Sequence, residues 1–177
     1  MAQCYVAPIT RIPEKNVFLA RVPASTTIQA GAIVDLSTLD TGIANNYQVY
    51  VASQPSADST MLGIVINDGW EMLADGRRPD GQPDYTKYEF GAGEVVCVVA
   101  LDTWTRFEIS EDCLDGDAPE VGGWLAAQAS DYALKAGETG ILRVDAKKYL
   151  RAGGQFGGSL TDGFIPTLIC TVAIAAA

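Results

Sequence analysis

The side chains best suited to chemistry in this chain are carboxylates, which gather between residues 108 and 120. Two carboxylates at a suitable separation can act as general acid and base, as in glycoside hydrolysis, and an acidic loop can also hold calcium. Residues 112–117 lack the alternating acidic positions of an EF-hand loop. We therefore predict a solvated acidic turn, with a carboxylate dyad and a weak calcium site as alternatives. The acidic residues are Glu108, Glu111, Asp112, Asp115, Asp117 and Glu120.

The sequence contains no histidine. This composition excludes Ser-His-Asp and Cys-His nucleophilic machinery within these residues, together with zinc sites built on imidazole. The glycine-rich run at residues 153–158 lacks the following Lys and Ser/Thr of a phosphate-binding loop. We therefore predict that the protein is not an enzyme and binds no cofactor or metal.

The four cysteines, Cys4, Cys97, Cys113 and Cys170, show no C-x-x-C spacing. Residues 1–6 lack the basic and apolar regions of a secretory signal, so we expect synthesis in the cytoplasm. Buried, reduced thiols follow from that expectation, with structural disulfides as the alternative. No apolar run reaches the roughly 20 residues that span a bilayer, which predicts no membrane association.

The charge is distributed unevenly along the chain. A net charge of −10 disfavours nucleic-acid binding, because such binding depends on neutralising phosphates. The residues before Asp35 nevertheless carry +2, against −12 for the remainder. We predict that this N-terminal segment reaches an acidic partner, with an ordinary first strand as an equal alternative. The partner-binding candidates are Arg11, Lys15 and Arg21, together with Arg77 and Arg78 in a polar loop.

Three tryptophans, Trp70, Trp104 and Trp124, could act as platforms for stacking against sugars. At least two of them fall in stretches of strand-like alternation. That position favours a place in the core over a ligand-facing role.

Short runs of β-forming residues predict most of the elements. We expect strands at 17–22, 32–36, 47–51, 61–66, 94–101, 104–109 and 167–174, and a hairpin over 121–128 and 132–134. Residues 94–101 are apolar on both faces, which predicts a central strand. Asp68 predicts one helical turn ending at Gly76, and Asp145 predicts a short helix over 146–152. Exposed loops are expected at 75–84 and 153–163.

One segment of the sequence occurs twice. Residues 30–40 return at 92–102, 62 positions later, with five of eleven positions identical. Each copy reads as a small-residue turn that leads into a strand. Because Asp35 and Ser37 lie on one face of the first copy, we expect that strand to be the more exposed. The pattern predicts an all-β fold, a single small β-barrel or β-sandwich domain over 17–177 with at most one or two short helices. An extended arm over 1–16 precedes it.

The chain resembles the small β-rich head decoration, or cement, proteins of tailed bacteriophages. The resemblance runs from Val17 to Leu134 and rests on short motifs at residues 28–34, 61–65, 91–96, 121–125 and 132–137. It implies a β-barrel or β-tulip core that sits on a capsid lattice, often as a trimer, and stabilises it without catalysis. The loop at 75–84 and the tail beyond Asp145 depart from the pattern.

These observations lead to a functional hypothesis. We expect a non-enzymatic virion protein on the outer capsid surface, with the major capsid protein as partner and with self-association, trimers favoured. The alternative is a β-sandwich binding module for glycan or a host surface, using Trp70 and the loop at 75–84. An enzyme with paired carboxylates, Glu108 and Asp112 among them, is the third hypothesis.

Overall fold

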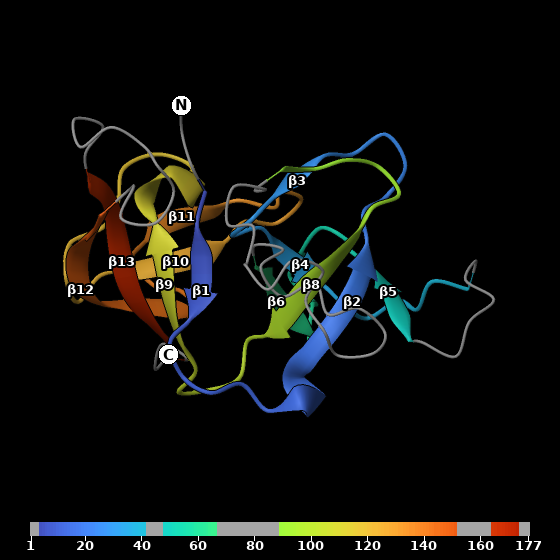
Figure 1. Cartoon of the computed structure of the whole chain (residues 1–177), viewed down its shortest axis with the longest axis horizontal. Coiled ribbons are helices and arrows are strands. Elements are labelled where there is room, and N and C mark those ends of the chain that lie inside the picture. Colours follow the sequence, from blue (N-terminus) through green and yellow to red (C-terminus); the bar gives the residue numbers. More distant parts are fainter. Residues whose placement is uncertain (1–3, 42–47, 67–88, 152–163, 174–177) are drawn as a thin grey trace.

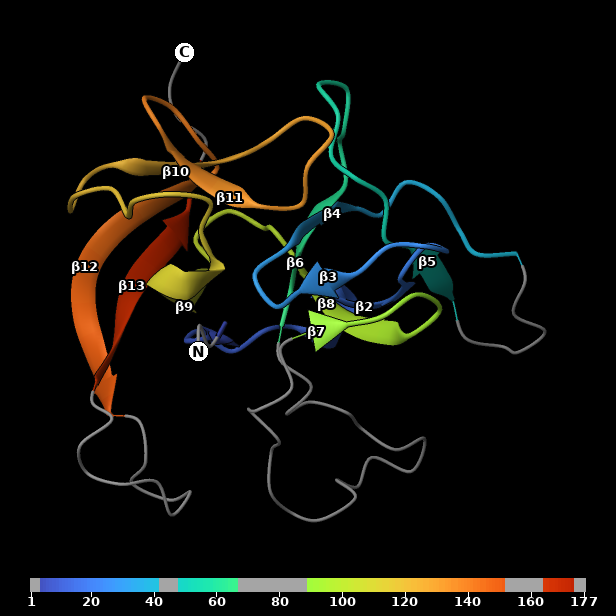
Figure 2. The same ribbon diagram turned by 90° about the horizontal axis from the view of Figure 1, so that it is seen from above.

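The structure, a computed structural model, describes residues 4–41, 48–66, 89–151 and 164–173. Within these ranges the chain is all-β, and its curled sheets form half-barrels (Figures 1 and 2). The only helical elements among the described residues are two one-turn 3-10 helices, η1 (Glu14–Asn16) and η3 (Glu111–Cys113). The predicted fold class is confirmed. None of the helices in these ranges has the length and apolar character needed to cross a bilayer.

The strands form two main sheets and one small pair. The six-stranded sheet has the order β1 (Val6–Pro8), β9 (Arg106–Ser110), β13 (Phe164–Val172), β12 (Leu142–Arg151), β10 (Trp124–Ala127) and β11 (Leu134–Gly137). The five-stranded sheet has the order β4 (Ile33–Asp35), β6 (Leu62–Val65), β8 (Val95–Ala100), β2 (Val17–Arg21) and β5 (Val49–Val51). The small pair joins β3 (Ile28–Gln29) to β7 (Glu89–Phe90).

Both sheets contribute to one hydrophobic core. The buried apolar side chains of both sheets belong to one cluster, from which water is excluded. Fully buried side chains come from both sheets, including Phe107, Leu125 and Leu142 from the first and Ile33, Ile64 and Val98 from the second.

Strand β8 lies at the centre of the five-stranded sheet, as its two apolar faces predicted. It is flanked by β6 and β2, and Val96 and Val98 are fully buried. The predicted hairpin is also confirmed, since β10 pairs with β11 in antiparallel register.

The two copies of the repeated segment form the same turn. Gly31 and Gly93 have φ angles of +86° and +81°. Each glycine is the third residue of a turn, closed by the Ala32 N–H donating to the Gln29 carbonyl (3.0 Å) and the Glu94 N–H to the Gly91 carbonyl (3.1 Å). A positive φ at the third residue, with none at the preceding Ala30 or Ala92, is typical of a type II turn and favours glycine. The repeat is therefore a repeated turn that leads into a strand.

Strand β4 corrects the expectation that the first copy is the more exposed. All three of its residues are buried, although β4 is an edge strand. Other segments cover the edge, since the Ile33 N–H donates to the Tyr132 carbonyl (2.8 Å) and the Asp35 N–H to the Ser53 carbonyl (2.9 Å). The Asp35 carboxylate accepts hydrogen bonds from the Ser59 hydroxyl and the Ser37 N–H, which satisfy it inside the protein.

The predicted helix over 146–152 is wrong, because this stretch forms the second half of β12. Residues Ala146 to Arg151 pair with β13 in antiparallel register, after a β-bulge at Asp145. Pairing with β13 overrides the local helix signal, as tertiary context commonly does. The Asp145 side chain does not cap a helix; it accepts a hydrogen bond from Thr171 and forms ion pairs with Arg106 and Arg143.

The segment over residues 1–16, expected as an extended arm, is described from Cys4 onward. Its described part packs on the six-stranded sheet, where β1 pairs with β9 and the Cys4 and Val6 side chains are each only 2% exposed. Burial of these two apolar side chains favours the docked position. The helical turn expected over 68–76 and the loops at 75–84 and 153–163 lie outside the described residues.

Candidate functional site

Two segments of chain cross between the sheets side by side. Residues 9–16 lead from β1 to β2, and residues 101–105 lead back from β8 to β9 (Figure 1). The Ile9 N–H donates to the Arg106 carbonyl (2.8 Å), and the Arg106 N–H donates to Thr10 Oγ1 (3.2 Å). At the other end the Asn16 side-chain amide donates to Asp102 Oδ2 (3.2 Å). The fold therefore fixes these two crossings against each other.

Trp104 lies at the tip of the second crossing with its indole 76% exposed. The Thr105 N–H donates to the Asp102 carbonyl (3.0 Å), which makes Trp104 the third residue of a turn. Its φ angle is +72°, so a bulky side chain occupies the left-handed position that Gly31 and Gly93 take in the repeated turns. Such a conformation costs about 1–2 kcal/mol for a residue other than glycine. Strain of this kind is typical of functional positions.

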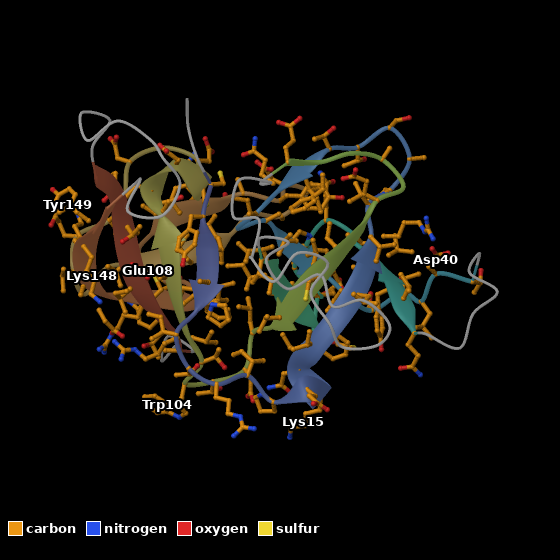
Figure 3. All side chains as sticks on the ribbon, in the orientation of Figure 1. Lys15, Asp40, Trp104, Glu108, Lys148 and Tyr149 are labelled. Carbon is orange, nitrogen blue, oxygen red and sulfur yellow. The ribbon has the colours of Figure 1, made fainter. Side chains whose placement is uncertain are left out.

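The first crossing presents two basic side chains beside this turn. Arg11 and Lys15 are exposed, and neither forms an ion pair among the described residues. Glu14, in the same 3-10 turn as Lys15, is exposed too, so both signs of charge are available. We call the exposed side chains Ile9, Arg11, Lys15 and Trp104 the crossover surface; Lys15 and Trp104 lie along one edge of the molecule in Figure 3.

Most other basic residues of the described part are already paired with acids. Arg106 and Arg143 contact Asp145, and the Lys135 and Lys147 ammonium groups lie 3.2 Å from Asp115 and 3.0 Å from Glu120. Lys148 is a further exposed cation, and in Figure 3 it lies on the side formed by β12 and β13, away from the edge that carries Lys15 and Trp104. Unpaired cations can bind an external carboxylate without first breaking an internal ion pair.

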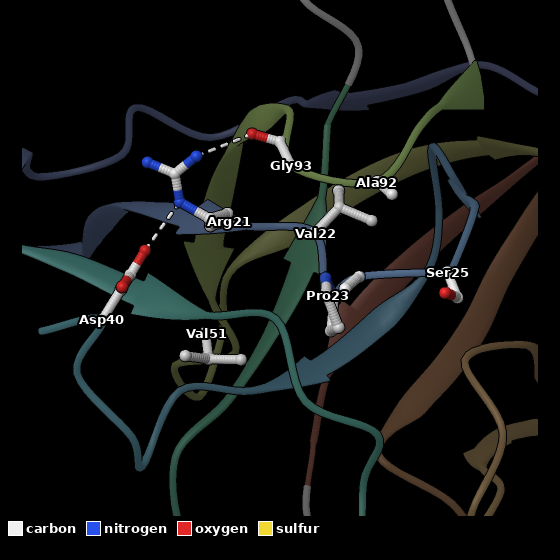
Figure 4. A pocket seen from close by; sticks show the side chains of 9 residues that line it. Arg21, Val22, Pro23, Ser25, Asp40, Val51, Ala92 and Gly93 are labelled. Carbon is white, nitrogen blue, oxygen red and sulfur yellow. Dashed lines mark hydrogen bonds and ion pairs between the residues drawn. The ribbon is translucent and has the colours of Figure 1, made fainter. Parts of the chain in front are cut away.

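Arg21, the third basic candidate, lies apart from Arg11 and Lys15 at the far end of β2. Its Nε is 2.6 Å from Asp40 Oδ2, and its Nη1 donates to the Gly93 carbonyl (2.9 Å; Figure 4). It lines an open hollow of about 540 Å³ with Val22, Pro23 and other mostly apolar residues. The guanidinium therefore links β2 to Asp40 and to the turn at Gly93. Arg77 and Arg78 lie outside the described residues.

The acidic residues between 108 and 120 contact different partners on different strands. Glu108 accepts a hydrogen bond from Thr167 Oγ1 (3.1 Å), while Asp115 and Glu120 pair with lysines on two different strands. Across the described ranges, no three His, Cys, Asp or Glu side chains converge in the manner of metal ligands.

The expectation of a core tryptophan is wrong for Trp104, whose run 104–109 becomes a strand only at Arg106. Trp124 is half-buried on β10, and Trp70 lies outside the described residues.

A signal in the sequence could have identified the turn at Trp104. The repeat extends beyond residue 40, because Leu39-Asp40-Thr41 returns as Leu101-Asp102-Thr103, and Gly42 stands at the position of Trp104. Tryptophan thus replaces the glycine that this turn favours.

Comparisons of this chain with protein families, with characterised proteins and with solved structures gave no match.

Proposed function

We propose that this chain is a non-enzymatic virion structural protein that binds the outer surface of a tailed-phage capsid through the crossover surface. Its partner is the major capsid protein, and copies of the chain also associate with one another, as trimers in the arrangement that the sequence resemblance implies. The proposal is supported by that resemblance and by the β-barrel-like fold. The observation that carries it is Trp104, a strained and exposed tryptophan on the crossing next to the one that bears Arg11 and Lys15, two cations without an ion pair among the described residues.

The composition of the crossover surface suits a protein interface. Tryptophan and arginine are the residues most enriched at positions that dominate binding energy. Docking would bury the indole, and a central tryptophan of this kind contributes about 2 kcal/mol or more to affinity. Ile9, which is 47% exposed, adds apolar area on the neighbouring crossing.

Charge provides the complementary part of the interface. Arg11 and Lys15 would pair with carboxylates of the capsid shell, which steers docking and fixes its orientation. Because the rest of the chain is strongly acidic, these cations favour an approach with the crossover surface toward the shell.

The proposal is tested first by composition and then by binding. Mass spectrometry of purified virions should detect the chain, and its gene should lie beside a major capsid gene. Purified protein should then co-sediment with capsid shells that lack it. The variant Arg11→Glu/Lys15→Glu should bind at least about tenfold more weakly, since it reverses the charge of both cations.

Lys148→Glu is the matched control, because Lys148 is also an exposed cation but lies outside the crossover surface. It should bind as the unmodified protein does. Absence of the chain from virions, or equal binding by the Arg11/Lys15 variant and the control, would overturn the proposal.

A glycan-binding module is a second candidate, favoured by the same exposed indole. A flat aromatic side chain with three-quarters of its surface free can stack on a sugar ring. Binding on a glycan array that disappears in Trp104→Ala but persists in the Arg11/Lys15 variant would support this candidate over capsid docking.

A further inference from the structure

Two cysteines far apart in the sequence meet where β1 joins the six-stranded sheet. Cys4 precedes β1, and Cys113 ends η3, directly after β9. The β1–β9 pairing continues outward past Val6. The Tyr5 N–H donates to Ser110 Oγ (2.9 Å), and the Ser110 N–H donates to the Tyr5 carbonyl (2.8 Å). This double contact brings the backbone of Cys4 alongside the η3 turn.

The two thiols make reciprocal contacts. Cys4 Sγ donates to the Asp112 carbonyl (3.3 Å), and Cys113 Sγ lies 3.7 Å from the Tyr5 carbonyl, toward which it donates. Each sulfur thus contacts the residue next to the other cysteine. The side chains also hydrogen-bond to each other, which lowers the pKa of Cys4 and raises the pKa of Cys113. Cys4 is therefore the more readily deprotonated of the two thiols.

Packing holds Cys113 in this position. A Cβ atom at Gly31 would stand 2.8 Å from the Cys113 Cβ and 3.2 Å from its Sγ, so only glycine lets the first repeated turn approach so closely. On the other side Cys4 Sγ lies 3.4 Å from Gln29 Oε1, in the same turn, which offers a second acceptor for its one S–H. The turn therefore confines both sulfurs to one small region.

We propose that Cys4 and Cys113 are a redox-active pair, which forms an intramolecular disulfide by exchange with a low-molecular-weight disulfide. Cys4 loses its proton, and the resulting thiolate attacks one sulfur of that reagent, breaks its S–S bond and releases one thiolate. Cys113 then loses its proton, attacks the Cys4 sulfur of the mixed disulfide and releases the second thiolate. The two cysteines are oxidised by two electrons in total, and the reagent is reduced to two thiols that take up the two protons.

The cross-link would fasten the N-terminal segment to the body of the protein. Access is available because Cys4 is followed by β1, a three-residue edge strand, which opens locally at low cost. The disulfide would close a long loop between residues 4 and 113 and so stabilise the folded state. This inference is independent of the crossover surface.

The test uses the full chain and oxidised glutathione as the reagent. After incubation the remaining thiols are alkylated, and the peptides are mapped by mass spectrometry. We expect a linked peptide pair joining Cys4 to Cys113, lighter by two hydrogens and reversible with dithiothreitol. The melting temperature of the oxidised protein should rise by roughly 10 °C.

Two variants and one condition serve as controls. Cys97→Ala/Cys170→Ala should form the same link, since neither residue takes part; burial and the nearby Asp145 charge raise the pKa of Cys170 to about 12. Cys113→Ser should stop at a glutathione adduct on Cys4. Denatured protein should form much less of this link. A stable adduct on Cys4 in the unmodified chain, no reaction at either residue, or equal yields from native and denatured protein would overturn the inference.

Discussion

The backbone N–H of Trp104 donates to the carbonyl of Val172 over 2.9 Å, and this bond holds an exposed indole on a strained turn. Val172 in turn donates to the Thr105 carbonyl (2.8 Å), so the last strand of the six-stranded sheet fixes the turn from both sides. The sheet thereby maintains a conformation that tryptophan does not favour by itself.

Replacement of Trp104 measures that strain. Trp104→Gly should be about 1 kcal/mol more stable than Trp104→Ala, because only glycine adopts a positive φ without steric cost. Urea denaturation of both variants provides the comparison. At an unstrained position, a variant with alanine is at least as stable as one with glycine. A Trp104→Ala variant as stable as Trp104→Gly, or more stable, would therefore contradict a strained turn.

The two repeated turns should respond differently to the same substitution. Gly93→Ala should cost about 1 kcal/mol from its positive φ alone, because no atom lies within 4 Å of the added Cβ. Gly31→Ala should cost about 2–4 kcal/mol, because the added Cβ also meets Cys113. Urea unfolding of the two variants tests this difference. Equal losses would show that the contact between Gly31 and Cys113 does not constrain the fold.

Asp35 should contribute to acid unfolding. Burial acts to raise the pKa of its carboxyl group, but hydrogen bonds from Ser59 and Ser37 outweigh burial and leave the pKa below its ordinary value. A lowered folded-state pKa stabilises the protein above the unfolded pKa of about 3.9, and this contribution disappears as the pH falls through the folded pKa.

The measurement is the free energy of unfolding of Asp35→Asn and the unmodified protein between pH 7 and pH 2. The unmodified protein should lose more stability below about pH 4 than the variant, since only its carboxyl group takes up a proton on unfolding. Parallel pH profiles would show that Asp35 has the same pKa in both states.

The sequence predicts those elements whose conformation depends on their own residues. Residues 95–100 contain enough apolar side chains on both faces to specify a central strand, and the Ala-Gly turns of the repeat carry their own conformational requirement. Arg11 and Lys15 could be identified as exposed partner candidates because they stand out as cations in an acidic chain.

The remaining features depend on distant partners. Residues 146–151 form a strand because β13 pairs with them, and β4 is buried because Tyr132 and Ser53 cover its edge. Trp104 is exposed because the turn before β9 directs it outward, although its alternating context resembles a core strand.

Deletion of residues 1–16 would remove the buried Val6 as well as Arg11 and Lys15. Point substitutions therefore test the crossover surface more cleanly than this deletion does.

Binding of Trp104→Gly to capsid shells, measured by co-sedimentation over a range of protein concentrations, tests the proposed docking most directly. Tyr149→Ala is the matched control, since Tyr149 is 74% exposed on β12 and lies outside the crossover surface. We expect the Trp104 variant to fold normally and to bind about 30-fold more weakly, a loss of about 2 kcal/mol, while the control binds as the unmodified protein does. Equal affinity of the folded Trp104 variant and the control would contradict docking through this surface.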